Sequence, residues 1–151
     1  MRGYAAIGLI RPKTVSNIGG VLRAAHVYGA SMVAVQGARC DIKSAQDTTK
    51  AWKHMPVLRG DDLFDLIPYG ARPVAVDLVD GAHLLPDFVH PDSAFYIFGP
   101  EDGTLGKSIL DRCQYRVMVP TAFCMNLAAT VNVVLYDRLA KSLRKSEARA
   151  A

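Results

Sequence analysis

Apolar runs alternate with helix-like segments along the chain, and this alternation predicts an α/β fold. Five runs are typical of buried strands, at Tyr4–Ile10, Ser31–Gln36, Arg72–Val79, Ala94–Phe98 and Tyr115–Val119. Because these runs are apolar almost throughout, we expect a parallel sheet with helices on both faces. Such sheets bind ligands beyond the carboxyl ends of their strands, so we expect a functional site in the loops that follow the runs.

Two helices have recognisable ends in the sequence. Asn17 is expected to cap a helix that continues to Tyr28 and stops at Gly29, and Asn126 opens a long helix that reaches about Arg144. The remaining segments predict only short elements: a helix near Trp52, a strand at Val57, and helical turns at Asp61–Ile67 and Lys107–Cys113.

The length of the chain favours one domain. With 151 residues, half of them apolar, the chain can enclose one core but not two. Residues 1–151 are therefore expected to form a single domain that ends in a basic helix or tail at about 137–151. The stretch 117–136 carries no charge, but Pro120 and several polar residues inside it favour buried core over a membrane span.

The charge is unevenly distributed. The net charge is +4, yet residues 1–60 carry nine Lys and Arg against two acids, residues 61–136 four against ten, and residues 137–151 five against two. Two basic ends around an acidic middle are compatible with one positive face that attracts a polyanion such as nucleic acid. A set of solvated surface charges accounts equally well for the same counts.

The cysteines and histidines do not form a pattern typical of disulfides or metal ligands. Cys40, Cys113 and Cys124 are widely spaced and odd in number, so we expect a reducing, cytoplasmic location. Arg11, Pro12 and Lys13 close the short apolar run at residues 1–10, so a secretory signal is not expected. The four histidines are not spaced as metal ligands, and no metal is expected.

Three motifs follow predicted strands. The first, Asn17–Ala25, places Gly19 and Gly20 in a helical turn, where glycine is unfavourable unless another backbone approaches closely. The second, Phe98–Gly106, is a glycine-rich loop whose Gly106-Lys107-Ser108 end resembles a phosphate loop, but Glu101 stands where that motif requires glycine.

The third motif, Val119–Leu127, is a loop that leads into the long C-terminal helix. Leu127, Val131, Val134 and Leu135 are spaced to pack on the sheet, which leaves Ala129 and Val133 for another surface, such as a second subunit. Cys124 is interpreted as a small apolar side chain, because no histidine lies near it in the sequence to activate a nucleophile.

In this order and spacing the three motifs resemble those of the SpoU/TrmH family of SPOUT-superfamily RNA ribose methyltransferases, in the form of its minimal members. The resemblance implies a parallel sheet whose C-terminal part forms a trefoil knot, which connection rules alone would disfavour. It also implies a homodimer in which two subunits build the active site.

The resemblance further implies S-adenosylmethionine (AdoMet) as the cofactor, held mainly by backbone groups. By position these belong to Val76, Asp77, Leu78, Gly99, Val119, Cys124, Met125 and Leu127. Two positions depart from the family pattern: Cys124 stands where serine is common, and Thr104 where glycine usually precedes Leu105. Neither change removes a backbone contact.

Arg23 matches the catalytic arginine of the family, and Asn17, Glu101 and Asn126 match its other polar signature positions. Because arginine stays protonated, we interpret Arg23 as a clamp on a phosphate or on the forming alkoxide, and as a base only in an unusual environment. The 2′-hydroxyl of a ribose is a weak nucleophile that must be aligned and relieved of its proton.

RNA is the implied substrate, with tRNA expected first and ribosomal RNA second. Arg11, Lys13, Lys141 and Arg144 are candidate phosphate contacts. Two other functions are weighed: a non-catalytic RNA-binding or AdoMet-sensing dimer of the same fold, which the retained Arg23 disfavours, and a nucleotide-binding enzyme, which the failed phosphate-loop spacing disfavours.

Overall fold

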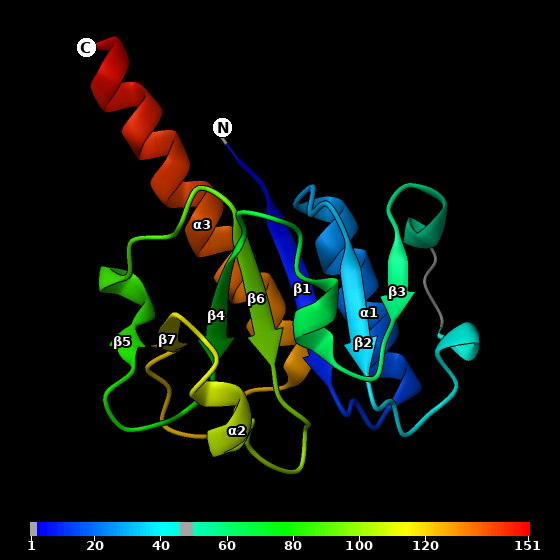
Figure 1. Cartoon of the computed structure of the whole chain (residues 1–151). Helices are drawn as coiled ribbons and strands as arrows, with labels where there is room; N and C mark the ends of the chain where they lie inside the picture. Colours follow the sequence, from blue (N-terminus) through cyan, green and yellow to red (C-terminus); the bar gives the residue numbers. More distant parts are fainter. Residues whose placement is uncertain (1–2, 46–49) are drawn as a thin grey trace.

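The computed structural model describes residues 3–45 and 50–151, which form an α/β fold around one parallel sheet (Figure 1). The seven strands lie in the order β3-β2-β1-β6-β4-β7-β5, and every pairing is parallel. Their bounds are β1 (Ala5–Ile10), β2 (Val33–Gln36), β3 (Val57–Arg59), β4 (Arg72–Val76), β5 (His83–Leu84), β6 (Ala94–Phe98) and β7 (Tyr115–Met118). The predicted parallel sheet is confirmed.

Helices cover both faces of the sheet, and each face has its own core. Helices α1 (Val15–Val27) and α3 (Leu127–Ala150) pack on one face, with Ile7, Tyr96 and Val134 fully buried between the layers. The opposite face is covered by η3 (Leu63–Leu66) and α2 (Lys107–Leu110), which enclose Phe95 and Ile97. Because residues on both sides of the central strands are buried, these strands are apolar almost throughout.

Close packing between two helices explains one of the two helical glycines, Gly20. A Cβ atom on Gly20 would lie 2.7 Å from the Cβ of Ala128, so the residue permits α1 and α3 to approach closely. The predicted packing of the long helix is also confirmed. Leu127, Val131, Val134 and Leu135 are buried, and Val133 is exposed.

Several boundaries differ from the sequence prediction. Helix α1 begins at Val15, with Thr14 rather than Asn17 at its cap, and α3 continues to Ala150 instead of ending near Arg144. Strand β4 ends at Val76, because Asp77 turns the chain and its carboxylate accepts a hydrogen bond from the backbone N–H of Leu78.

The short elements are confirmed in part. The expected helix near Trp52 is η2 (Ala51–Lys53), and the expected strand at Val57 is β3. The structure adds η1 (Ile42–Ser44), β5 and η4 (Leu85–Asp87), which are too short to produce a periodic pattern. Residues 46–49 of the ambiguous stretch 41–60 lie outside the described part of the chain.

The last strand in the chain is inserted between two earlier strands. Strand β7 pairs with β4 on one side and β5 on the other, although residues 77–82 connect β4 directly to β5. From β7 the chain returns through residues 119–126 to α3, which packs beside α1. The trefoil knot implied by the family is not tested by this strand order and stays an expectation.

The uncharged stretch 117–136, expected to be buried core, comprises the end of β7, the loop after it and the first part of α3. No helix within residues 3–45 and 50–151 is long and apolar enough to cross a membrane.

Candidate functional site

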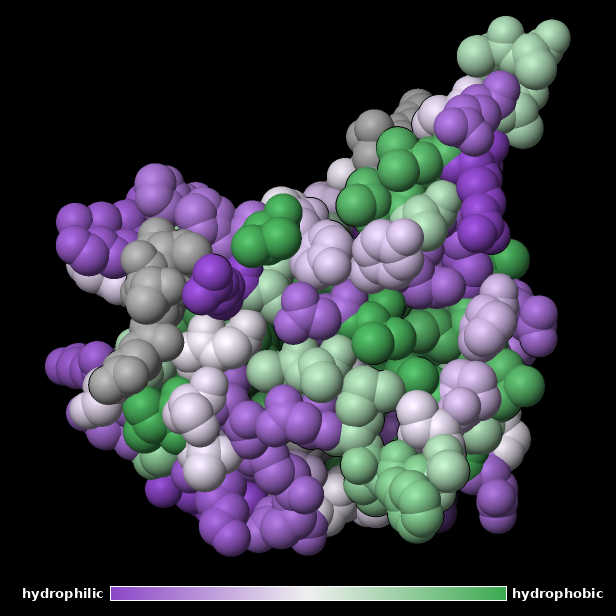
Figure 2. All heavy atoms as spheres, turned by 180° about the vertical axis from the view of Figure 1, so that it is seen from behind, coloured by the Kyte–Doolittle hydropathy of each residue, from purple (hydrophilic) through white to green (hydrophobic). Residues whose placement is uncertain are grey.

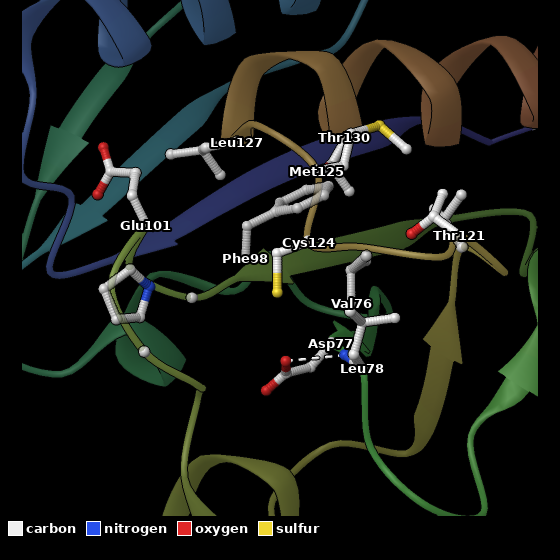
Figure 3. Close-up of a pocket in the computed structure, with 14 residues that line it drawn as sticks. Val76, Asp77, Leu78, Phe98, Glu101, Thr121, Cys124, Met125, Leu127 and Thr130 are labelled. Carbon is white, nitrogen blue, oxygen red and sulfur yellow. Dashed lines mark hydrogen bonds between the residues drawn. The ribbon is translucent and has the colours of Figure 1, made fainter.

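A cleft opens at the carboxyl ends of β4, β6 and β7, where the parallel sheet predicts a ligand site (Figure 3). The space within the cleft, together with its open mouth, is about 670 Å³. All eight residues predicted to hold the cofactor line it: Val76, Asp77, Leu78, Gly99, Val119, Cys124, Met125 and Leu127. Residues of the second and third motifs therefore converge on one cavity with the end of β4, while the role of each residue stays a prediction.

Asp77 ties two walls of this cleft together. One of its carboxylate oxygens accepts a hydrogen bond from the N–H of Leu78 at 2.8 Å, and the other accepts from the N–H of Leu105 at 2.9 Å. These bonds join the end of β4 to the glycine-rich loop after β6. The Cys124 side chain points toward the same part of the cleft (Figure 3).

The glycine-rich loop passes close to its own continuation at Gly99. A Cβ atom there would lie 3.2 Å from the backbone nitrogen of Leu105 and 3.4 Å from the Leu105 side chain. The absence of a side chain therefore lets the loop fold tightly along the cleft.

Glu101 lies at one end of the cleft and binds the start of α1. Its carboxylate accepts hydrogen bonds from the N–H of Lys13 at 2.9 Å, from the N–H and hydroxyl of Thr14 at 3.3 and 2.8 Å, and from Asn17 Nδ2 at 2.9 Å. Asn17 Nδ2 also donates to the Thr14 hydroxyl at 2.7 Å. This long-range partner fixes the backbone at Lys13 and Thr14, the two positions directly before Val15, where the helix begins.

The same network reaches α3 through Asn126. Asn126 Nδ2 donates to Asn17 Oδ1 at 2.8 Å, and Asn126 Oδ1 caps α3 by accepting from the N–H of Ala129 at 3.2 Å. The three predicted polar signature residues, Asn17, Glu101 and Asn126, are therefore in direct contact. They join the ends of three elements that lie far apart in the sequence.

This network keeps Glu101 ionised. Partial burial would raise the pKa of the Glu101 carboxyl, but the hydrogen bonds from Asn17, Thr14 and Lys13 outweigh burial and lower the pKa to about 2. A permanently charged carboxylate is suited to holding donors in place and unsuited to accepting a proton near neutral pH.

Arg23 lies outside this cluster. It is on an exposed side of α1, and among the described residues that line the cleft neither Arg23 nor the two asparagines of the network is present. A spacing of six residues places Arg23 on a different stripe of the helix from Asn17. Within one chain, Glu101 thus lines the cleft, whereas Arg23 lies on the exposed surface of α1.

The candidate phosphate contacts occupy two regions. Arg11 and Lys13 are exposed in the loop after β1, close to the cleft, and Arg144 is exposed on the part of α3 that projects from the body (Figure 1). Lys141 has partners within the chain. Its ammonium donates to the carbonyls of Leu85 and Phe88 and pairs with Asp137.

Sequence reasoning missed several residues of the site. The cleft is also lined by Phe98, Pro100, Gly103, Thr121 and Thr130. Thr14, the cap residue of α1, is of a type common at helix caps, and this is the signal that could have identified it. Arg39 and Asp102, which pair beside the cleft, gave no local signal, because they are far apart in the chain.

No suitable cluster for a metal ion is present among residues 3–45 and 50–151. The three cysteines are free, and burial raises the pKa of the Cys113 thiol to about 11.

Comparisons with known structures agree on the fold. The structure is similar to the SpoU methyltransferase AviRb from Streptomyces viridochromogenes, with a TM-score of 0.83 and 20% identity, over 96% of this chain and 62% of that chain. The AviRb complex with AdoMet is similar to the same degree, with a TM-score of 0.83, 21% identity, and coverage of 95% and 62%. The present chain thus spans about three-fifths of the length of AviRb.

A structure described as giving insights into the 2-OH methylation of C/U34 on tRNA matches over nearly its whole length. Its TM-score is 0.77 at 22% identity, and the match covers 92% of this chain and 91% of that chain. An RNA 2′-O ribose methyltransferase is also similar, with a TM-score of 0.78, 24% identity, and coverage of 95% and 58%. At these identities the likeness shows the fold.

Comparison by sequence gives the family. No curated protein sequence matches the chain significantly. The model of the SpoU rRNA Methylase family, however, matches residues 5–136, from the first strand of the sheet into the middle of α3 and through all three motifs. On this match, supported by the fold and by the convergence of the second and third motifs on one cleft, the chain belongs to the SpoU family.

Proposed function

We propose that the protein is an AdoMet-dependent RNA methyltransferase that transfers a methyl group to a ribose 2′-hydroxyl. The observation that carries the proposal is the cleft. In a SpoU-family chain, the eight residues expected to hold AdoMet line one cavity, with Glu101 at its end. Two similar structures, whose descriptions name 2-OH methylation on tRNA and an RNA 2′-O ribose methyltransferase, support the ribose as acceptor.

Transfer RNA is the proposed substrate class, with ribosomal RNA second. The similar structure described with tRNA is matched over 91% of its length, whereas the other similar chains carry long parts that this chain does not match. A cytoplasmic location, expected from the three free cysteines, belongs to the same proposal.

The chemistry of the cleft fits AdoMet. Phe98, Val119 and Leu127 offer apolar surface for an adenine ring, and the backbone around Leu78 and Gly99 offers polar groups beside it. When bound, AdoMet supplies a methyl group on a positively charged sulfur. An apolar, water-poor pocket is compatible with a reaction in which that charge is dispersed.

The chain's own residues would hold the cleft walls in position and bind the RNA. Glu101, Asn17 and Asn126 fasten the glycine-rich loop to the starts of α1 and α3, which keeps the cleft walls at a fixed separation. Arg23 would bind a phosphate next to the target ribose, or stabilise the alkoxide as the hydroxyl loses its proton.

A homodimer is part of the proposal. Arg23 does not line the cleft of its own chain, so it can act there only if a second copy brings it to the cleft. The outer surface of the layer formed by α1 and α3 carries exposed apolar side chains, among them Val27 on α1 and Val133 and Tyr136 on α3. Figure 2 shows this face with hydrophobic surface across its middle, as expected of a surface that another subunit covers.

A non-catalytic dimer that binds RNA or senses AdoMet is the alternative. Both functions require the cleft, and they differ only in turnover. The test is incubation with methyl-labelled AdoMet and unmodified tRNA or ribosomal RNA, followed by nucleoside analysis for 2′-O-methylation. Label in ribose of one RNA class supports the proposal and identifies the substrate. AdoMet binding by calorimetry without label in either RNA points to a missing partner or substrate, or to the non-catalytic alternative.

Arg23→Ala is expected to lower the rate of methyl transfer at least about 100-fold, because the variant loses a charged contact made at the reacting centre. AdoMet affinity and the oligomeric state are expected to stay nearly intact, because Arg23 is assigned to the RNA phosphate or the forming alkoxide and not to the cofactor or to a contact between subunits. Single-turnover transfer and calorimetry measure the two effects. Normal turnover by the variant would contradict the assigned role.

A further inference from the structure

Two adjacent carboxylates in the glycine-rich loop bind different neighbours. Glu101 binds the start of α1, as described above. Asp102 forms a two-pronged ion pair with Arg39, whose Nη1 and Nη2 atoms lie 3.0 and 2.6 Å from its two carboxylate oxygens. The ammonium of Lys13 lies 3.7 Å from the same carboxylate. The loop is thus held from two directions at consecutive residues.

Arg39 also holds the loop that follows β1. Its Nε donates to the carbonyl of Arg11 at 3.2 Å, and its backbone N–H donates to the carbonyl of Pro12 at 2.9 Å. Arg11 adopts a left-handed conformation with φ of 48°, which is costly for a residue other than glycine. Contacts from residues 36–39 therefore maintain a conformation that the β1–α1 loop would not adopt by itself.

These contacts make one body of three segments: residues 11–14, residues 36–39 and residues 99–105. The third segment contributes Gly99, Pro100, Glu101 and Gly103 to the wall of the cleft. The guanidinium group of Arg39 contacts both of the other segments. It does so without lining the cleft itself.

The ion pair is too exposed to contribute much to global stability. The side chains of Arg39 and Asp102 are 31% and 45% exposed, and exposed pairs typically contribute little. A two-pronged pair nevertheless fixes direction as well as distance, which a single contact does not. Its effect is therefore local, on the position of the loop.

From this geometry we infer that Arg39 is a positioning residue for the cofactor cleft, which acts by holding the 99–105 wall through Asp102. The inference rests on the proposed function for its ligand, AdoMet. The position of the wall itself can be measured without any ligand.

Three variants and a matched control test the inference. Arg39→Ala removes the pair, Arg39→Lys keeps the charge but loses the two-pronged geometry, and Arg39→Asp combined with Asp102→Arg reverses the pair. The control is Arg112→Ala. Arg112 forms a similar pair with Asp62, with side chains 47% and 39% exposed, and packs on Phe64 away from the cleft.

Hydrogen exchange of the intact protein reads the wall directly. Arg39→Ala is expected to increase amide exchange in residues 99–105 and 11–14, and Arg112→Ala to leave both segments unchanged. Calorimetry reads the cleft. The dissociation constant for AdoMet is expected to rise about tenfold in Arg39→Ala, less in Arg39→Lys, and to recover in part in the reversed pair.

The outcomes separate the inference from the proposed function. Unchanged exchange in Arg39→Ala, or equal AdoMet affinity in that variant and the wild type, would overturn the positioning role. An equal loss of affinity in Arg112→Ala would also overturn it, because the effect would then follow general stability. If the wild-type protein bound no AdoMet, the proposed function would fail, and the exchange result would still decide whether Arg39 holds the wall.

Discussion

Glu101 shows how much one side chain can organise at the residue scale. Every group that its carboxylate binds is a hydrogen-bond donor. These donors are the backbone N–H groups of Lys13 and Thr14, the Thr14 hydroxyl and the Asn17 amide. Replacement by glutamine turns one acceptor oxygen into a donor that faces other donors. The isosteric change therefore breaks the network, although it preserves the shape of the side chain.

The ionisation of Glu101 gives a prediction with a definite sign. The pKa of this carboxyl is about 2, below the ordinary value of 4.5, so its stabilising effect is present above pH 4.5 and is lost as the pH falls toward 2. Glu101→Gln is expected to lower the free energy of unfolding by about 1 kcal/mol at pH 7, a value discounted because the carboxyl is largely exposed.

Urea unfolding at pH 7 and pH 3 measures this effect. The difference between wild type and Glu101→Gln is expected to shrink at pH 3. Glu147→Gln, on the exposed end of α3, is the control and is expected to change the free energy by less than about 0.5 kcal/mol. A difference between wild type and Glu101→Gln that stayed constant with pH would contradict the account of the network.

Residues of the cleft could be predicted from sequence where a motif contains them, as for Gly99 and Leu127. Arg39 could not, because its partner Asp102 lies 63 positions away and neither residue differs from an ordinary surface charge in its local sequence. Contacts of this kind become visible only after the sheet has placed the ends of β2 and β6 at one edge.

Helices α1 and α3 pack closely against each other, and this packing depends on the small residues Gly20 and Ala128. A Cβ on Gly20 would come within 2.7 Å of the Ala128 Cβ. Gly20→Ala is therefore expected to destabilise the fold by about 1–2 kcal/mol, even though alanine favours a helix over glycine by up to about 1 kcal/mol.

The double variant Gly20→Ala with Ala128→Gly restores the space and exchanges the two helix propensities. It is expected to unfold at nearly the same denaturant concentration as the wild type. A single variant that was more stable than the wild type would show that the helices separate at no cost, contrary to the close packing described here.

Elements with a long apolar pattern were predicted with the correct type, and their ends were less accurate. Helix α1 begins two residues before Asn17, where Glu101 binds the backbone of Lys13 and Thr14 just before the first helical residue. Strand β5 has only two residues and is a strand because it pairs with β7, so no local pattern could have predicted it. The tertiary partners at both places are absent from any local window.

The apolar surface on α1 and α3 is the proposed contact between two subunits. Tyr136 is 61% exposed on α3, and Val27 is 67% exposed on α1. If this face joins two subunits, Tyr136→Glu buries a charge in the interface and is expected to weaken the dimer at least about tenfold. Light scattering after size exclusion measures the change in mass.

Tyr69→Glu is the matched control, because Tyr69 is fully exposed in the turn before β4. It is expected to leave the oligomeric state unchanged. A dimer that was unaffected by Tyr136→Glu, or a wild type that was monomeric at every concentration, would contradict the proposed interface. Loss of methyl transfer together with loss of the dimer would link the interface to the division of Arg23 and the cleft.

The insertion of β7 between β4 and β5 determines when the molecule becomes complete during its synthesis. Until residue 118 has left the ribosome, β4 has an unpaired edge and β5 has no neighbour. The cleft also needs residues 119–130, so no shorter nascent chain can form it. The chain up to β6 must therefore remain without the binding site until β7 is placed between β4 and β5, and competence to bind arises only once residues 119–130 have been added.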